Sequence, residues 1–138
     1  MTICFYHGVD GDGKCSGALV KQKIPETKLY PVSHSSIDNI EFLQKNVNKD
    51  EVVIICDFCF SIRCMQFLLD TCVNVIWLDH HVSSIKSIKE AGLSIQGIRN
   101  VEKAGCEFPC VGYCPDFFVI GAIDPCRSSA QEHNLPQG

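Results

Sequence analysis

The sequence predicts an α/β domain, built as an open parallel β-sheet of about five strands flanked by helices. Short apolar runs recur along the chain, and most are followed by a segment with helical periodicity. The run VVIIC at 52–56 is apolar at every position, which is typical of a strand buried on both faces of a parallel sheet. Strands separated by one helix each imply right-handed crossovers and parallel pairing.

The first half of the chain gives two strands and two helices. Residues 2–6 are a short apolar run and the predicted first strand, and a glycine-punctuated loop follows over 7–13. Residues 15–23 have helical periodicity, and residues 27–32 are the predicted second strand. Apolar residues recur at helical spacing over 37–47, so this segment is the second predicted helix.

The second half continues the alternation. Residues 51–56 are the predicted third strand, and residues 62–72 form a helix for which Ser61 is the expected N-cap. Residues 73–78 are the predicted fourth strand. A helix over 83–91 ends near a glycine, and residues 93–98 are the predicted fifth strand.

The remaining chain has less regular patterning. Residues 102–106 are able to start a helix, but Pro109 and Pro115 prevent its continuation, and the apolar run 117–123 fits either a strand or a helix. Residues 128–138 are polar and are interpreted as a frayed tail. The sequence therefore predicts one domain over 1–127 and a tail over 128–138, which suits a chain of 138 residues.

Composition excludes several classes of protein. Hydrophobic residues make up 46% of the chain, charged residues 20%, and the formal net charge is −4. This balance argues against disorder, and the acidic charge against a broad basic surface for long nucleic acid. No apolar run reaches the roughly 18 residues of a membrane span, and the N-terminus does not resemble a signal peptide. A cytoplasmic location is expected.

Ten cysteines are present, several of them inside apolar runs. Without an export signal, we interpret most of them as buried, reduced thiols. The alternative is a structural zinc site built on Cys56 and Cys59, which form a Cys-x-x-Cys pair, or on Cys106, Cys110 and Cys114.

Acidic and imidazole side chains follow the predicted strands. Ligands of parallel sheets bind beyond the carboxyl ends of the strands, so residues with chemical roles are expected there. Four apolar runs carry such residues at their ends: His7, Asp10 and Asp12, then Asp57, then Asp79, His80 and His81, and finally Asp124 after FFVIGAI. All of them are expected to converge on one edge of the sheet.

Crowded carboxylates repel one another unless cations bind among them. A mixture of carboxylates and imidazoles suits Mn²⁺, Fe²⁺, Co²⁺ or Mg²⁺, and a shared carboxylate can hold two ions about 3.5–4 Å apart. Taken singly, Asp57 or Asp79 is a cap or turn residue, and His80 and His81 are incidental surface residues. The joint pattern favours a shared dinuclear metal site.

Three segments resemble motifs one to three of the DHH phosphoesterase family: HGVDGDGKCSGAL, VVIICDFC and VIWLDHHVS. The family includes single-strand-specific exonucleases, oligoribonucleases, cyclic-dinucleotide phosphodiesterases and family II inorganic pyrophosphatases. IGAIDPCR resembles the fourth motif, a late strand ending in aspartate, and the preceding EKAGCEF resembles its small-residue helix start. The resemblance covers roughly residues 2–127 and implies the fold of the family's N-terminal domain.

The resemblance also implies a ligand set for two Mn²⁺ ions, with Mg²⁺ or Co²⁺ as alternatives. The first ion would be held by His7, Asp10 and Asp57. The second would be held, with Asp57 as the bridge between the two, by Asp12, Asp57, His80 and Asp124.

The family resemblance assigns catalytic roles as well. His81 would contact the phosphate or assist the leaving group, and Asp79 would orient a neighbouring imidazole. Two residues are candidates for phosphate binding: Ser16 at the start of the first helix, for which capping or packing is the alternative, and Arg127.

The chain departs from the family pattern in its late segment, where Pro125 directly follows Asp124, and in a missing C-terminal element. Family members carry a C-terminal substrate-binding domain with a glycine-rich G-G-G-H element, and this sequence contains no such run. Substrate is then expected to be held mainly through metals and phosphate. We also expect a homodimer or a partner subunit to supply the missing lid.

The expected function is metal-dependent hydrolysis of a phosphodiester or phosphomonoester bond by a dinuclear-metal-activated water. The expected substrate is a small phosphorylated compound or a short single-stranded oligonucleotide. The alternative is a catalytically weak or inactive DHH-like subunit for binding or assembly, which needs a partner domain. A structural zinc protein that uses the cysteines is the third hypothesis.

Overall fold

The structure, a computed structural model, describes residues 1–99 of the 138-residue chain. The predictions for 102–106, 117–123 and the 128–138 tail lie outside these residues, as do those for Asp124 and Arg127.

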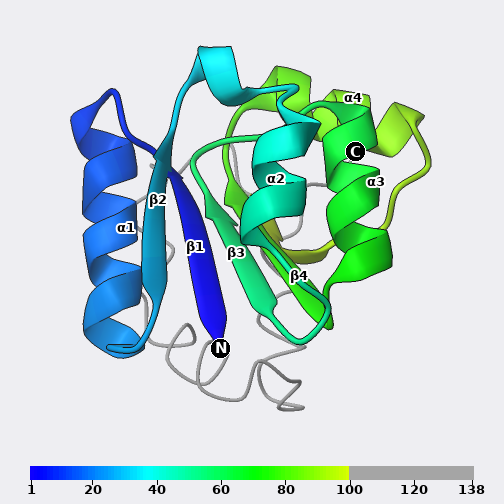
Figure 1. The fold of residues 1–138 in the computed structure, drawn as a ribbon. Coiled ribbons are helices and arrows are strands. Elements are labelled where there is room, and N and C mark those ends of the chain that lie inside the picture. The colour runs from blue at the N-terminus through cyan, green and yellow to red at the C-terminus, as the bar shows by residue number, and fades with distance from the viewer. Residues whose placement is uncertain (100–138) are drawn as a thin grey trace, which may run out of the picture.

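Five strands form one sheet in which every neighbouring pair is parallel (Figure 1). The order across the sheet is β2-β1-β3-β4-β5, so the chain reverses its direction of winding between β1 and β3. The strands are β1 (Thr2–His7), β2 (Lys28–Val32), β3 (Val52–Cys56), β4 (Asn74–Asp79) and β5 (Gln96–Arg99). The predicted open parallel α/β sheet is confirmed.

Helices cover both faces of this sheet. In Figure 1, α1 (Gly11–Lys23) lies on one face, and the other α-helices lie on the opposite face. That second layer contains α2 (Ile40–Asn46), α3 (Ile62–Thr71) and α4 (Val82–Glu90), and a 3₁₀ turn, η1 (His34–Ser36), precedes it.

The sheet separates two apolar clusters, which explains why its central strands are apolar at nearly every position. On the α1 face, Val20 packs with strand residues that include Ile54 and Ile76. On the other face, Leu68 of α3 packs with strand residues that include Phe5 and Trp77. All of these side chains are at most 1% exposed.

The boundaries of two helices differ from the prediction. α1 begins at Gly11 and not at residue 15, because the Asp10 carboxylate caps it by accepting a hydrogen bond from Gly13 N at 2.8 Å. The segment predicted as one helix over 37–47 is divided into η1 and α2. The reason is that the Asn39 side chain accepts a hydrogen bond from Phe42 N at 3.1 Å and starts α2 anew.

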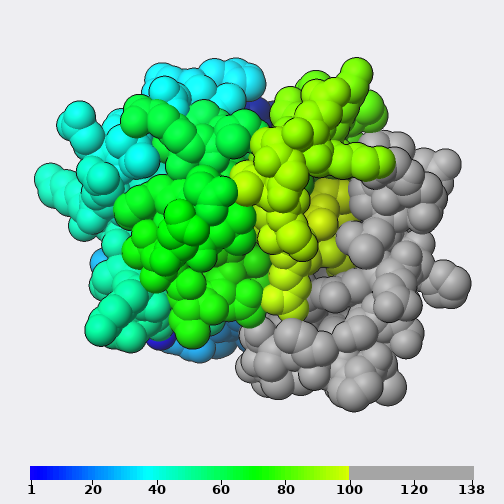
Figure 2. Space-filling view, turned by 90° about the vertical axis from the view of Figure 1, so that its right-hand side faces the viewer, coloured from blue at the N-terminus to red at the C-terminus, as the bar shows by residue number. Residues whose placement is uncertain are grey.

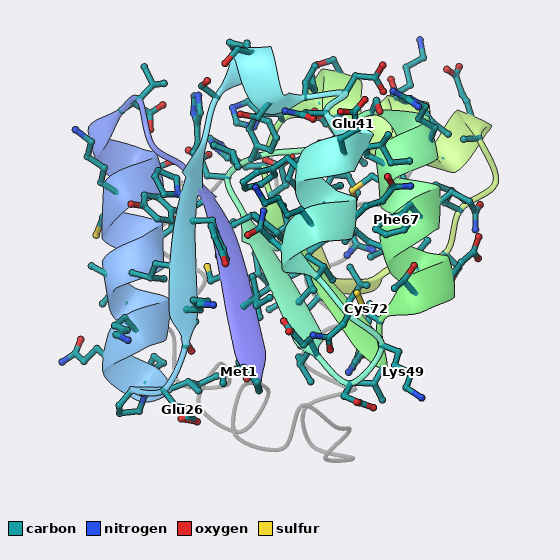
Figure 3. All side chains as sticks on the ribbon, viewed as in Figure 1. Met1, Glu26, Glu41, Lys49, Phe67 and Cys72 are labelled. Carbon is teal, nitrogen blue, oxygen red and sulfur yellow. The ribbon has the colours of Figure 1, made fainter. Side chains whose placement is uncertain are left out.

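The carboxyl ends of the strands lie at one edge of the sheet, together with the loops that lead into η1 and the helices. The opposite edge is marked in Figure 3 by Met1, Glu26 and Lys49. In parallel sheets of this kind, ligands bind at the carboxyl edge beside the point where the winding reverses. β1 and β3 flank this point, so the residues after them are the first place to look for a site.

Within residues 1–99, no helix is both long and apolar enough to cross a membrane.

Candidate metal centre

The first part of the site comes from the junction between β1 and α1. His7 ends β1, and its Nδ1 lies 3.3 Å from Asp10 Oδ2 and 3.9 Å from Asp57 Oδ2. The first turn of α1 passes directly over the end of β1, since a Cβ on Gly13 would lie 1.8 Å from the His7 carbonyl oxygen. A glycine at this position therefore permits the approach that brings Asp12, in the same turn, to the site.

Asp57 lies at the centre of the site. It follows β3 directly with φ of +58°, and its amide donates a hydrogen bond to Leu78 O at 2.9 Å. Only 1% of its side chain is exposed. Its Oδ1 lies 2.7 Å from His80 Nε2, whereas its buried Oδ2 has no hydrogen-bond partner among the described residues. The position is left-handed, a conformation that aspartate tolerates better than most residues.

Burial raises the pKa of the Asp57 carboxyl from its ordinary value of 3.8 to about 6. The hydrogen bond from His80 opposes this shift, and the negative charges of Asp12 and Asp10 add to it. Ionising a carboxyl group in this setting is costly unless a positive charge is bound close to it.

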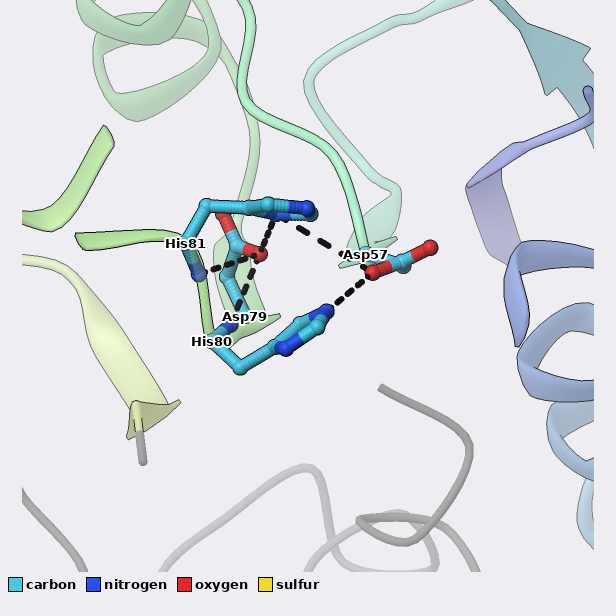
Figure 4. A group of neighbouring side chains, drawn as sticks. All are labelled: Asp57, Asp79, His80 and His81. Atoms are coloured by element: carbon cyan, nitrogen blue, oxygen red, sulfur yellow. Dashed lines mark hydrogen bonds and ion pairs between the residues drawn. The ribbon is translucent and has the colours of Figure 1, made fainter. Parts of the chain in front are cut away.

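The end of β4 supplies the other part of the site, shown in Figure 4. The fully buried Asp79 accepts three hydrogen bonds through Oδ1: from His80 N at 2.8 Å, from His81 N at 3.3 Å and from His81 Nδ1 at 2.7 Å. The side chain of Asp79 therefore fixes the orientation of the His81 ring. This is the positioning that the sequence-based hypothesis gave to Asp79.

His81 is 48% exposed in its side chain. The hydrogen bond to Asp79 raises the pKa of this imidazole to about 8, although partial burial opposes the shift. The negative charges of Asp79, Asp57 and Asp10 act in the same direction as the hydrogen bond. His81 is thus a proton donor near neutral pH, and its Nδ1 is committed to Asp79.

His80 connects the two parts of the site. Its Nε2 lies 2.7 Å from Asp57 Oδ1 and 3.4 Å from Asp12 Oδ2. In a metal site this nitrogen must be unprotonated, so a divalent cation would take the place of the proton shared between His80 and Asp57.

Two groups of side chains have metal-ligand atoms within 4.8 Å of one another, and Asp57 belongs to both. One group is His7, Asp10 and Asp57; the other is Asp57, Asp79, His80 and His81. The first matches the set expected for the first ion. Of the set expected for the second ion, Asp57 and His80 lie in the other group, Asp12 contacts His80, and Asp124 lies outside the described residues.

The donor atoms fit a divalent cation. Among the described residues, Asp57 Oδ2 and Asp79 Oδ2 are buried oxygens without hydrogen-bond partners. Leaving a charged buried oxygen without a partner costs roughly 1–3 kcal/mol or more. Carboxylate oxygens mixed with imidazole nitrogens are the donor set that suits Mn²⁺ and its neighbours in the first transition series.

Ser16 does not line this cluster. Its side chain is fully buried, and its hydroxyl donates a hydrogen bond to Asp12 O at 2.8 Å within α1. This placement favours the packing alternative over phosphate binding.

The structure adds two residues at the same edge that the sequence did not single out. His34 opens η1 just after β2 and is exposed, with its ring centroid 5.7 Å from that of His7. The rule that functional residues follow strands would have found it, because His34 lies two residues beyond the predicted second strand.

Arg99 ends β5, and its guanidinium donates hydrogen bonds to Trp77 O at 3.2 Å and Ile95 O at 2.8 Å. Burial lowers its pKa to about 10, and the negative charge of Asp79 opposes that shift. Arg99 therefore provides positive charge near the buried Asp79. The sequence-based prediction considered only acidic and imidazole residues after the strands and therefore missed this arginine.

The described cysteines take no part in the ligand groups. The six cysteines among residues 1–99 form no disulfide with one another, and Cys4, Cys56 and Cys64 are fully buried. Cys56 packs in the cluster on the α1 face, whereas Cys59 packs against the cluster on the opposite face. The Cys-x-x-Cys pair thus does not converge on one zinc ion, and Cys106, Cys110 and Cys114 lie outside the described residues.

Comparison with known proteins supports the fold. No protein-family model and no curated protein matches the sequence. A solved structure described as an uncharacterized protein from Helicobacter pylori G27 is similar, with a TM-score of 0.61 and 15% sequence identity. The match covers 96% of this chain and 40% of that one, so this chain spans less than half the length of its structural neighbour.

Proposed function

We propose that the carboxyl edge of the sheet is a dinuclear metal centre that hydrolyses phosphoric ester bonds. The observation that carries this proposal is the position of Asp57, a buried carboxylate shared by two groups of metal-ligand side chains. The DHH resemblance of the same segments agrees with it. The substrate would be a phosphodiester or phosphomonoester in a nucleotide or short oligonucleotide.

The electrostatics of the site supports bound cations. Four aspartates lie among the clustered residues, and three of them, Asp12, Asp57 and Asp79, are at least three-quarters buried in their side chains. Burial and the negative charges of Asp12 and Asp10 raise the pKa of Asp57, as expected for this desolvation and repulsion. Two divalent cations would remove that penalty and, when bound, would supply an activated water and neutralise the charge of a phosphate.

The residues around the cations have separate tasks in this proposal. His7 and Asp10 would hold one ion, and His80 the other, with Asp57 between them. His81 presents a protonated ring that is held by Asp79, which suits it to contact phosphate oxygen or to donate a proton to the departing oxygen.

The test uses the purified full chain after treatment with EDTA and measures both metal binding and turnover. We expect about two Mn²⁺ per chain by calorimetry, and Mn²⁺-dependent hydrolysis of bis(p-nitrophenyl) phosphate, pyrophosphate or short oligonucleotides. Asp57→Asn should abolish turnover and weaken Mn²⁺ binding. The matched control is Asp50→Asn, which removes the same charge from an exposed loop at the opposite edge. Normal turnover by Asp57→Asn, or a wild-type chain that binds no Mn²⁺, would contradict the proposal.

A binding or assembly subunit is the second candidate, and the apolar rim of the site favours it. Val9 lies on the loop after β1 and Val82 at the start of α4, with exposed fractions of 65% and 64%. A domain that covers the centre would bury both of these side chains. This candidate predicts Mn²⁺ binding without turnover by the chain alone, and turnover only after a partner is added.

A further inference from the structure

A pocket of about 230 Å³ opens at the same edge of the sheet as the proposed metal centre. Three segments line it: Ile37 from the loop after η1, residues 59–62 from the loop after β3 and the start of α3, and Ser83, Ser84 and Ser87 from α4. Figure 2 shows the face of the molecule on which α3 (green) adjoins α4 and the 91–99 segment (yellow-green).

The pocket begins close to the metal centre along the chain. Cys59 is two residues from Asp57, and Ser83 is two residues from His81. Two residues span at most about 7 Å, so a molecule with its phosphate at the centre has the pocket within reach.

The lining is uncharged. None of the described side chains that line the pocket is aspartate, glutamate, lysine, arginine or histidine. Ile37 and Ile62 form apolar walls that remain 40% and 38% exposed, and Phe60, which also lines the pocket, is buried. The serines of α4 supply hydroxyl groups that both donate and accept hydrogen bonds. Apolar walls with a few hydroxyls suit an uncharged heterocyclic ring better than a phosphate.

One wall of the pocket is held in place before any ligand binds. Ser61 N donates to Ile37 O at 2.7 Å, and Ser61 Oγ donates to Asp38 Oδ1 at 2.5 Å. Arg63 Nε also donates to Asp38 Oδ1, at 2.7 Å, so the loop that carries Ile37 is tied to the start of α3. A preformed wall reduces the ordering cost of binding.

We propose that this pocket binds the nucleobase of a nucleotide whose phosphate lies at the metal centre. The role of the phosphate rests on the proposed function, whereas base binding rests on the pocket itself. The two parts can therefore be tested separately.

Base binding is tested first with adenosine, which carries no phosphate. In an NMR titration of the metal-free full chain, we expect amide shifts confined to 59–62 and 83–87. Ser87→Tyr, at an exposed position on α4, should fill the pocket and remove these shifts. Ile62→Ser removes an apolar wall of the pocket and should weaken the affinity for adenosine severalfold. The control is Gln22→Tyr, which adds the same ring at an exposed, uncharged position of α1 and should change nothing. Shifts elsewhere, or none in the wild type, overturn the proposal.

Coupling to the metal centre is tested with Mn²⁺-loaded protein by calorimetry. We expect AMP to bind about tenfold more tightly than ribose 5-phosphate, a difference of about 1.4 kcal/mol, because only AMP carries a base that contacts the apolar walls of the pocket. Ser87→Tyr should remove this difference, whereas the control Gln22→Tyr should keep it. Equal affinities for the two compounds in the wild type overturn base recognition. Adenosine binding without any Mn²⁺-dependent phosphate binding would instead overturn the proposed function and leave the pocket assignment intact.

Discussion

Replacement of Asp57 by asparagine should reverse the order of stability between variant and wild type when metal is added. In the metal-free protein, burial raises the pKa of Asp57 from 3.8 to about 6. Each pKa unit corresponds to about 1.36 kcal/mol, so ionising Asp57 in the folded chain costs about 3 kcal/mol of unfolding free energy above pH 6. Asparagine has no such cost, tolerates the left-handed backbone, and keeps an oxygen that is able to accept from His80.

The sign of the pH dependence follows from the same shift. A carboxyl whose folded pKa is raised contributes stability that is fully present below pH 3.8 and is lost as pH rises through about 6. Metal-free Asp57→Asn should therefore match the wild type near pH 4 and exceed its stability by up to about 3 kcal/mol at pH 8. Mn²⁺ at about 1,000 times its dissociation constant should stabilise the wild type by about 4.1 kcal/mol, which exceeds that difference, and should stabilise Asp57→Asn much less.

The assay is urea unfolding of both proteins at pH 4 and pH 8, in EDTA and in Mn²⁺, with Asp50→Asn as the control. Asp50 is exposed in a loop at the far edge of the sheet, so its replacement should change stability by less than about 0.5 kcal/mol in every condition. The reasoning is refuted if Asp57→Asn is the less stable protein in EDTA at pH 8, or if Mn²⁺ stabilises it as much as the wild type.

Further predictions concern the ends of β1 and β4. Asp79→Asn should lower the pKa of His81 from about 8 toward 6.5, because the hydrogen bond to Asp79 is the main cause of the shift; ¹H NMR titration of the ring in EDTA measures it, and an unchanged pKa would remove Asp79 from its positioning role. Gly13→Ala should destabilise the fold by about 3 kcal/mol, because the new Cβ would lie 1.8 Å from the His7 carbonyl oxygen. Gly11→Ala meets nothing within 4 Å and should stabilise the same helix by up to about 1 kcal/mol. Thermal unfolding compares the two glycine variants, and an equal response from both would show that α1 does not depend on the close approach.

The strands and their parallel pairing could be predicted from the sequence because burial on both faces leaves a plain signal. The run at 52–56 is apolar throughout, and β3 is the central strand, with clusters on both of its faces. The gathering of acidic and imidazole residues at one edge follows from the same topology, since parallel strands all end on the same side.

The start of α1 could not be predicted because glycine is common both in loops and in helices that closely approach another part of the chain. Gly11 and Gly13 look like a flexible loop in the sequence, yet both lie in the first turn of α1. Gly13 has no side chain to clash with the His7 carbonyl oxygen, which the helix closely approaches. That approach depends on tertiary packing, so the local sequence does not reveal it. Likewise, the break between η1 and α2 depends on which way the Asn39 side chain turns, and the apolar spacing does not reveal it.

The grouping of individual ligands was the least predictable part of the site. Asp79 and His81 are joined by a side-chain hydrogen bond, which depends on rotamers and not on spacing. The positive φ of Asp57 is also invisible in the sequence, where VVIICD is typical of a strand followed by a turn residue.

Position 57 requires a residue that tolerates the left-handed backbone and that also carries a negative charge for the proposed metal centre. Glycine and asparagine satisfy the backbone but bring no charge, and glutamate brings the charge on a side chain one methylene longer that does not favour this conformation. Aspartate alone meets both demands. Saturation mutagenesis at position 57 should therefore enrich asparagine and glycine when metal-free variants are selected for thermostability. Selection for catalytic activity should enrich aspartate alone.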